Sequence, residues 1–292
     1  MSDVYTDNMT RNDSEVQRLD TQLDYINDNI GYLLHPAVVA SLPPKPQIAD
    51  IGTGTGKFLL LLREQNPDAI LDGYDISPKL YPQESTLPPN ISLSVLDMKQ
   101  PAPKELHGKY DVVHARLLVA AMLPTDWAIV VRNLTELLKP GGFLQWEECD
   151  FLGVKYLRGL VDSKVEAIRF MGNLFSDALR ERSEHGWCTL PREMRDAGLN
   201  PVLTDVTASD RLPETRKTLT TNVTGLFFSW ARMMTERGAP GAMTNDRLDE
   251  MEKKTSEDVE SGGYVRYEIY VACGRKPWEL SGALRGVHLL GL

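Results

Sequence analysis

The spacing of hydrophobic positions along the first half of the chain alternates between helical and strand-like patterns. From residue 16 to residue 35 they recur every third or fourth position, which is typical of the buried face of an amphipathic helix. After a proline-rich linker, short apolar runs bounded by glycine, proline or asparagine indicate strands. We predict strands over 47–51, 70–75, 91–96, 110–115 and 142–148, and helices over 56–65 and 126–138. This alternation predicts an α/β fold.

The second half of the chain has longer helical segments and fewer strands. We predict helices over 162–182, 191–197, 213–237 and 247–259, and strands over 201–207 and 264–273. The polar residues 1–13 are expected to be frayed, and the proline-rich segment 77–90 to be a loop. The tail from residue 276 has no clear pattern. We therefore expect an α/β core to which helices have been added.

One predicted strand is joined to a predicted helix by a glycine-rich turn. Residues 48–58 read IADIGTGTGKF, with glycine at positions 52, 54 and 56. Glycine is needed where backbone turns tightly or approaches a ligand, because a Cβ atom would clash. Such a turn before a helix N-terminus is typical of a nucleotide-type site. The third glycine comes one residue earlier than in the dinucleotide fingerprint, which disfavours a nicotinamide oxidoreductase.

Two acidic residues accompany this loop. Asp50 lies at its mouth, and no basic residue stands within the loop before Lys57, so the loop suits a ligand with an amine better than a pyrophosphate. Asp75 closes the next predicted strand, about 20 residues beyond the loop, where an acid can bind ribose hydroxyls. The loop and this acid together predict a nucleoside site.

Three further motifs follow in order along the chain. An alternating strand runs into Asp97 and Met98, residues 110–116 read YDVVHAR, and residues 137–147 read LLKPGGFLQWE. In the last motif, proline stops the helix and two glycines turn the chain. With the glycine loop and its acid, these motifs resemble the class I S-adenosylmethionine (SAM)-dependent methyltransferases. The resemblance is closest to the fungal secondary-metabolism methyltransferases, including the global-regulator type.

The resemblance covers roughly residues 16–150 and implies a SAM site. The glycine loop would surround the methionine part, Asp75 would bind ribose, and Ile76 would pack on adenine. Asp97 and Met98 would flank the adenine edge. The candidate cofactor-binding residues are Asp50, Gly52, Thr53, Gly54, Gly56, Asp75, Ile76, Asp97, Met98, His114 and Arg116.

Two places depart from the family pattern. Leu23 follows Gln22 where related sequences often have histidine, and Lys57-Phe58 stands where Ile-Trp is common. These departures leave the cofactor loop intact. They limit what the resemblance implies about the residues on the substrate side.

Methyl transfer needs a nucleophile held in line with the S–CH₃ bond, and a phenol or alcohol acceptor also needs a base. The candidate catalytic residues are His185, Glu147 and His114. His185 is a loop histidine that can titrate near neutral pH or simply lie at the surface. His114 either contacts the cofactor pocket or is a structural histidine at a strand end. Glu147 and Glu148 are adjacent on a strand and point to opposite faces, so at most one of them faces the pocket. The alternative interpretation is that both side chains are exposed to solvent.

Two of the added helices are rich in aromatic residues and methionine. These residues are Phe170, Met171 and Phe175 in one helix, and Phe227, Phe228, Trp230, Met233 and Met234 in the other. They indicate a hydrophobic lid over a bulky, flat substrate, or ordinary packing of the helices on the core.

Composition and charge restrict the kinds of binding partner that we expect. A net charge of −9 argues against sequence-independent binding to nucleic acid, which needs basic surface. The three cysteines are far apart, which suits a reducing compartment and provides no metal site. The start of the chain resembles neither a signal nor a transit peptide, and no apolar run approaches the roughly 20 residues of a membrane span. We expect a cytoplasmic protein with a bulky, apolar small-molecule substrate and no membrane or nucleic-acid partner, and we leave a homodimer open.

We predict a seven-stranded, Rossmann-like class I methyltransferase core with a helical cap. Its parts are an N-terminal cap segment (1–45), the SAM-binding core (46–150), cap helices (151–200), strands six and seven with a helical insertion at about 213–259 (201–275), and a tail (276–292). The expected function is O- or N-methylation of a small molecule, as in fungal secondary metabolism.

Two alternatives to this function stay open. The protein could bind SAM but catalyse a non-methylating step, such as a pericyclic reaction, or it could be a regulator acting through partners. A large, closed apolar cavity would favour the enzyme, and an exposed apolar patch would favour the binding protein.

Overall fold

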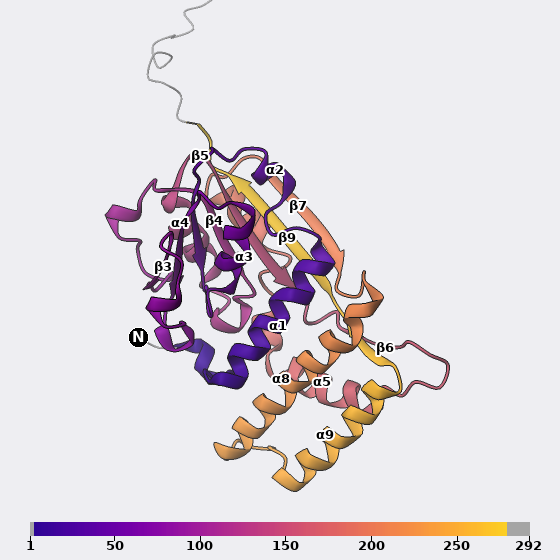
Figure 1. The fold of residues 1–292 in the computed structure, drawn as a ribbon. Helices are drawn as coiled ribbons and strands as arrows, with labels where there is room; N and C mark the ends of the chain where they lie inside the picture. Colours follow the sequence, from indigo (N-terminus) through magenta and orange to yellow (C-terminus); the bar gives the residue numbers. More distant parts are fainter. Residues whose placement is uncertain (1–2, 279–292) are drawn as a thin grey trace, which may run out of the picture.

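The computed structural model describes residues 3–278, which form a seven-stranded mixed sheet with helices on both faces (Figure 1). The strands of this sheet are β1 (Gln47–Ile51), β2 (Ile70–Asp75), β3 (Ile91–Val95), β4 (Tyr110–Arg116), β5 (Leu138–Cys149), β7 (Val202–Ala208) and β9 (Glu268–Arg275). Their order is β3-β2-β1-β4-β5-β9-β7, and β9 runs antiparallel to both of its neighbours. The Rossmann-like α/β prediction is confirmed.

Helices cover both faces and extend beyond one end of the sheet. The α-helices are α1 (Asp13–Ile30), α2 (Pro36–Val39), α3 (Lys57–Gln65), α4 (Trp127–Leu137), α5 (Glu166–Ala178), α6 (Arg180–Ser183), α7 (Leu190–Asp196), α8 (Arg216–Glu236) and α9 (Asn245–Glu260). The 3₁₀ turns are η1 (Val4–Asp7), η2 (Pro78–Leu80), η3 (Glu84–Thr86), η4 (Lys104–Leu106), η5 (Val119–Ala121) and η6 (Pro213–Thr215). Helices α5, α8 and α9 pack together as a cap, and α1 runs from α8 along the sheet (Figure 1).

The sheet separates two buried hydrophobic clusters. Because successive side chains of a strand point to opposite faces, Ile48 joins the cluster under α1, α3 and the cap, while neighbouring Ala49 joins the cluster under α4 and α7. In the second cluster the rings of Trp127 and Trp146 lie 5.5 Å apart. Both faces of the sheet are buried, which explains why β1 and β4 have apolar residues on both of their faces.

Two predicted helices are shorter than their hydrophobic spacing indicates. Helix α1 ends at Ile30 rather than at residue 35, because Gly31 adopts a left-handed conformation (φ 92°) and donates its N–H to Asn27. The segment predicted as one helix over 162–182 contains α5 and α6, which are separated at Leu179.

The strand predicted over 264–273 divides into two. Its first part, β8 (Gly263–Arg266), pairs with β6 (Lys155–Arg158) in a small antiparallel sheet that we did not predict. The second part is β9. The buried Tyr267 lies between them and donates its N–H to the Ser209 hydroxyl, so the chain leaves one sheet and enters the other there.

The expectation of a frayed N-terminus is wrong for residues 3–12. Val4 and Met9 are buried, and η1 packs against η5. Arg237 in turn donates hydrogen bonds to the carbonyl groups of Thr6 and Asp7, at 2.8 and 2.6 Å. The apolar residues in this polar segment are what anchor it. Most of the C-terminal tail, from residue 279 on, lies outside the described residues.

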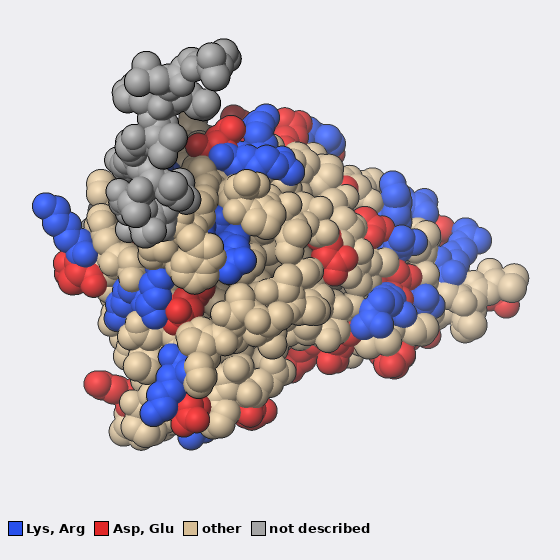
Figure 2. Space-filling view, turned by 90° about the horizontal axis from the view of Figure 1, so that it is seen from above, with Lys and Arg blue, Asp and Glu red and all other residues tan. Residues whose placement is uncertain are grey.

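On the face seen in Figure 2, lysine and arginine side chains are interspersed with aspartate and glutamate. Within residues 3–278, none of the helices combines the length and the apolarity that crossing a membrane would need.

Candidate functional site

A cavity lies at the carboxyl ends of β1, β2 and β4, which is where open α/β sheets bind ligands. The core forms one wall, and α1, α5 and α8 form the other. The glycine loop crosses its floor.

All three glycines of the loop have positive φ: 70° at Gly52, 55° at Gly54 and 75° at Gly56. A Cβ atom on Gly52 would lie 2.4 Å from a methyl group of Leu118, so this side chain after β4 would have to shift if residue 52 were not glycine. At Gly54 a Cβ would meet only Leu19, at 3.7 Å, and both residues line the cavity. Gly54 therefore leaves space for a ligand to approach the backbone.

Asp75 stands at the end of β2 beside this loop. One carboxylate oxygen accepts the Gly54 N–H at 3.1 Å, and the other accepts the Ser77 N–H at 3.1 Å. Burial raises the pKa of Asp75, although these two N–H groups oppose the rise. The loop and the acid therefore form one unit on the cavity wall, with carboxylate lone pairs left to accept hydroxyl groups.

The end of β3 contributes the next part of the wall. Asp97 and Met98 line the cavity beside Ile76. Asp97 accepts the Lys99 N–H at 3.0 Å, and Asn133 from α4 donates to the Met98 carbonyl at 2.9 Å. These bonds fix the backbone turn that presents Asp97 and Met98 to the cavity.

A histidine and two carboxylates are buried beneath the glycine loop. Nδ1 of His114 lies 2.7 Å from Asp50, and its Nε2 lies 3.5 Å from Glu147. The imidazole stacks on Phe58, with ring centroids 3.8 Å apart. Burial alone would lower the pKa of His114, but the hydrogen bonds and charges of Asp50 and Glu147 raise it. Both ring nitrogens face buried carboxylates, so His114 is poorly placed to act as a base on a substrate.

The two adjacent glutamates are buried, so the solvated alternative is wrong for both of them. Gln145 donates to Glu147 at 2.9 Å, while Trp146 and the backbone N–H of Leu118 donate to Glu148. Burial raises the pKa of Glu148 to about 8. Neither side chain lines the cavity. Both support the strand and loop that build its wall.

The other candidate base follows two residues of the cavity wall, Arg182 and Ser183, without belonging to the lining itself. His185 is half-buried in the loop after α6, and it does not belong to the cavity lining. Arg116, in contrast, lines the cavity at the end of β4. The other proposed cofactor residues except Gly56 also line it; these are Asp50, Gly52, Thr53, Gly54, Asp75, Ile76, Asp97, Met98 and His114.

The outer wall comes from the cap and is mostly apolar. Phe175, Leu179, Val223 and Phe227 line the cavity, whereas Phe170 points to solvent and Met171, Phe228 and Met233 belong to the core. Both interpretations of the aromatic helices therefore apply, each to different residues.

The N-terminal segment forms part of the same wall, which sequence reasoning missed. Val4, Tyr5 and Met9 line the cavity, and the Tyr5 hydroxyl donates to Glu15 at 2.6 Å. The only signal for this role was the presence of apolar and aromatic residues in a polar stretch.

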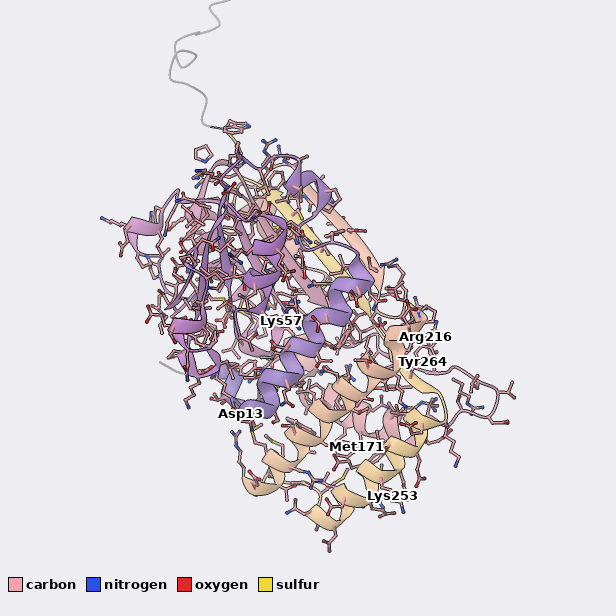
Figure 3. All side chains as sticks on the ribbon, viewed as in Figure 1. Asp13, Lys57, Met171, Arg216, Lys253 and Tyr264 are labelled. Atoms are coloured by element: carbon pink, nitrogen blue, oxygen red, sulfur yellow. The ribbon has the colours of Figure 1, made fainter. Side chains whose placement is uncertain are left out.

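Helix α1 is tied to the glycine loop. The Thr55 hydroxyl donates to Asp20 at 2.6 Å, and Lys57 pairs with Asp24 at 2.7 Å. Figure 3 shows Lys57 beside α1. Lys57, which stands where related sequences commonly have isoleucine, therefore links the first helix to the cofactor loop.

The strand order and this cavity define a class I methyltransferase fold with a nucleoside-type site. Residues 49–144 match the family described as a methyltransferase domain. The chain is 42% identical to the methyltransferase grgD of Penicillium over 47% of this chain and 50% of that protein. It is 28% identical to the N-methyltransferase tcpN of Claviceps purpurea over 91% and 96%, and 30% identical to the secondary metabolism regulator laeA of Coprinopsis cinerea over 35% and 24%.

Several of the curated relatives are matched over only about half of their length. Within these limits, residues 49–144 match a methyltransferase domain, and the chain is similar to fungal methyltransferases.

Proposed function

We propose that the protein transfers the methyl group of SAM to a nitrogen or oxygen atom of a small, largely apolar molecule. The observation that carries the proposal is that one cavity combines the glycine loop and Asp75 with the apolar cap wall. An adenosyl ligand and an organic acceptor could therefore lie side by side, shielded from water.

The cofactor lies, in this proposal, along the ends of β1, β2 and β3. Asp75 would accept the ribose hydroxyls, and Asp97 and Met98 would flank adenine. Asp50 lines the cavity beneath the loop, where a carboxylate suits the ammonium group of SAM.

Nitrogen is the acceptor atom that the wall favours. The histidine and carboxylates that the structure describes on the lining already have partners: His114 with Asp50, Asp75 with backbone N–H groups, Asp97 with Lys99 and Asp3 with Arg11. An amine can lose its proton to water before it binds, so it needs positioning rather than a base. The name of tcpN, an N-methyltransferase, agrees with this choice.

The proposal is tested in two steps. Calorimetry with SAM and with S-adenosylhomocysteine should show micromolar binding of both. The protein should then be incubated with SAM carrying a labelled methyl group and a fractionated fungal small-molecule extract. A labelled product that requires the protein, and that is lost with Asp75→Ala, would support methyl transfer. Absence of binding by both nucleosides would overturn the proposal.

A further inference from the structure

Arg116 is a cation on the cavity wall that has no ion-pair partner within the described residues. It stands at the end of β4, and its Nη1 atom is buried without a hydrogen bond. The other arginine and lysine side chains on the wall each form an ion pair; they are Arg11, Arg18, Lys99 and Arg182. Among the basic side chains that the structure describes on the wall, Arg116 is therefore the one without an ion pair.

The acids of the wall do not neutralise this charge. Asp50 bonds to His114, Asp75 accepts two backbone N–H groups, and Asp97 accepts another. Removing a cation from water without a counter-charge is costly, and the cost falls when an anion pairs with it. The cavity thus has one positive charge for which a ligand can supply the partner.

The position of Arg116 in the sheet shows which end of a ligand it faces. Ile51 of β1 is registered with Tyr74 of β2 on one side and with Ala115 of β4 on the other. Asp75 and Arg116 are the next residues of those strands, so they flank the glycine loop on opposite sides. If Asp75 binds ribose, Arg116 faces the end of the ligand away from the nucleoside.

We propose that Arg116 binds a carboxylate group, supplied by the methionine tail of SAM or by the acceptor. A guanidinium group matches a carboxylate through two parallel hydrogen bonds. One unpaired positive charge also matches the single negative charge of a carboxylate better than a phosphate monoester, which carries about −1.5 to −2. This inference rests on the proposed function for the identity of the cofactor.

The first experiment asks whether the carboxylate belongs to SAM. Wild-type protein and Arg116→Gln are titrated with S-adenosylhomocysteine and with 5′-methylthioadenosine, which lacks the amino-acid tail. If the tail is the ligand, Arg116→Gln binds S-adenosylhomocysteine about 10- to 100-fold more weakly and binds methylthioadenosine as the wild type does. Arg116→Lys keeps the charge but loses the paired geometry, and should fall between them.

The second experiment asks whether the carboxylate belongs to the acceptor. Thermal shifts are measured with phenylacetate and with neutral phenylacetamide, with and without S-adenosylhomocysteine. If the acceptor is the source, phenylacetate stabilises the wild type more than phenylacetamide does, and Arg116→Gln removes the difference. Arg132→Gln, which removes an exposed arginine on α4 outside the cavity, is the matched control for charge.

The inference is overturned if Arg116→Gln matches the wild type in both experiments, or if it weakens both nucleosides equally. Failure of the wild type to bind either nucleoside would instead count against the proposed function, and the phenylacetate comparison would then decide the role of Arg116.

Discussion

His114 and Asp50 are directly registered neighbours on β4 and β1, and they form a buried hydrogen bond of 2.7 Å between Nδ1 and a carboxylate oxygen. The bond joins the two strands immediately before the loops that line the cavity. Glu147 on β5 lies on the other side of the imidazole, so three adjacent strands meet through one histidine. The central part of the sheet is therefore held together by charge as well as by packing.

Replacing this histidine should destabilise the fold most at low pH. His114→Asn leaves Asp50 without its buried partner, which should cost about 3–5 kcal/mol. Because the folded-state pKa of His114 is raised, its contribution is complete below the unfolded pKa and is lost as pH rises through the folded value. Urea denaturation of both proteins from about pH 6 to about pH 9 should show the difference shrinking. His107→Asn, at an exposed site, is the control; an equal, pH-independent loss in both variants would contradict the assignment.

Glu148 should make the protein less stable as pH rises. Its pKa is raised by burial to about 8 from an ordinary value of 4.5, so the folded state binds the proton more tightly than the unfolded state. Its contribution is complete below about pH 4.5 and lost through about pH 8. Glu148→Gln, which can still accept from Leu118, should therefore gain stability relative to the wild type across that range, by on the order of a few kcal/mol. Glu64→Gln, at an exposed site, should show no such trend in the same denaturation series.

Asp75→Ala should weaken SAM binding by about 1.5–3 kcal/mol through loss of hydrogen bonds to a charged group. The loss includes the bond from Gly54, which positions the loop. Calorimetric titration with SAM measures the change, and Asp75→Asn should recover part of it. Unchanged affinity in the alanine variant would remove this acid from the site.

Gly54→Val should abolish SAM binding by placing a branched side chain where the backbone faces the cavity. Valine is also disfavoured at φ 55°, so a control for backbone strain is needed. Gly108→Val provides it, since Gly108 has φ 62°, no atom within 4 Å of the point where a Cβ would lie, and no place in the cavity lining. Both variants should lose some thermal stability, but only Gly54→Val should lose the titration signal. Normal binding by a folded Gly54→Val would contradict the placement of the loop.

Loosening the N-terminal segment should speed the release of the cofactor. Arg237→Gln removes the hydrogen bonds from α8's C-terminal end to Thr6 and Asp7, which hold η1 over the cavity. Stopped-flow displacement of S-adenosylhomocysteine should show faster dissociation with little change in melting temperature. Arg192→Gln, which removes an exposed pair on α7, should leave the rate unchanged. Equal dissociation rates in the two variants would show that η1 does not restrict release.

Local sequence patterns predicted the elements that build the sheet. The bounds predicted for β1 and β2 match the structure, because short apolar runs ending in the glycine loop and in Asp75 leave little freedom. β5 begins at Leu138, four residues before its predicted start, since its pairing with β4 continues past an irregularity near Tyr110. That extension depends on a neighbouring strand, which periodicity does not include.

Some residues of the site could likewise be predicted from local sequence, and others could not. Asp75 and the glycine loop have a local spacing that indicates their position. The burial of Glu147 and the contacts of Tyr5 arise from pairings between distant segments, and no local pattern contains them. His185 has the chemistry of a base, but no local pattern indicates where its loop lies, and the structure places it outside the cavity lining.

The bonds from Arg237 to Thr6 and Asp7 join residues 231 and 230 positions apart. These bonds are exposed and depend on the core to bring the two segments together, so we expect them to form at the end of folding. Residues 3–12 would then be among the last to take their place, and a chain with its sheet already complete would still have an open cavity. A fully closed cavity would then require this final step as well as the folded core.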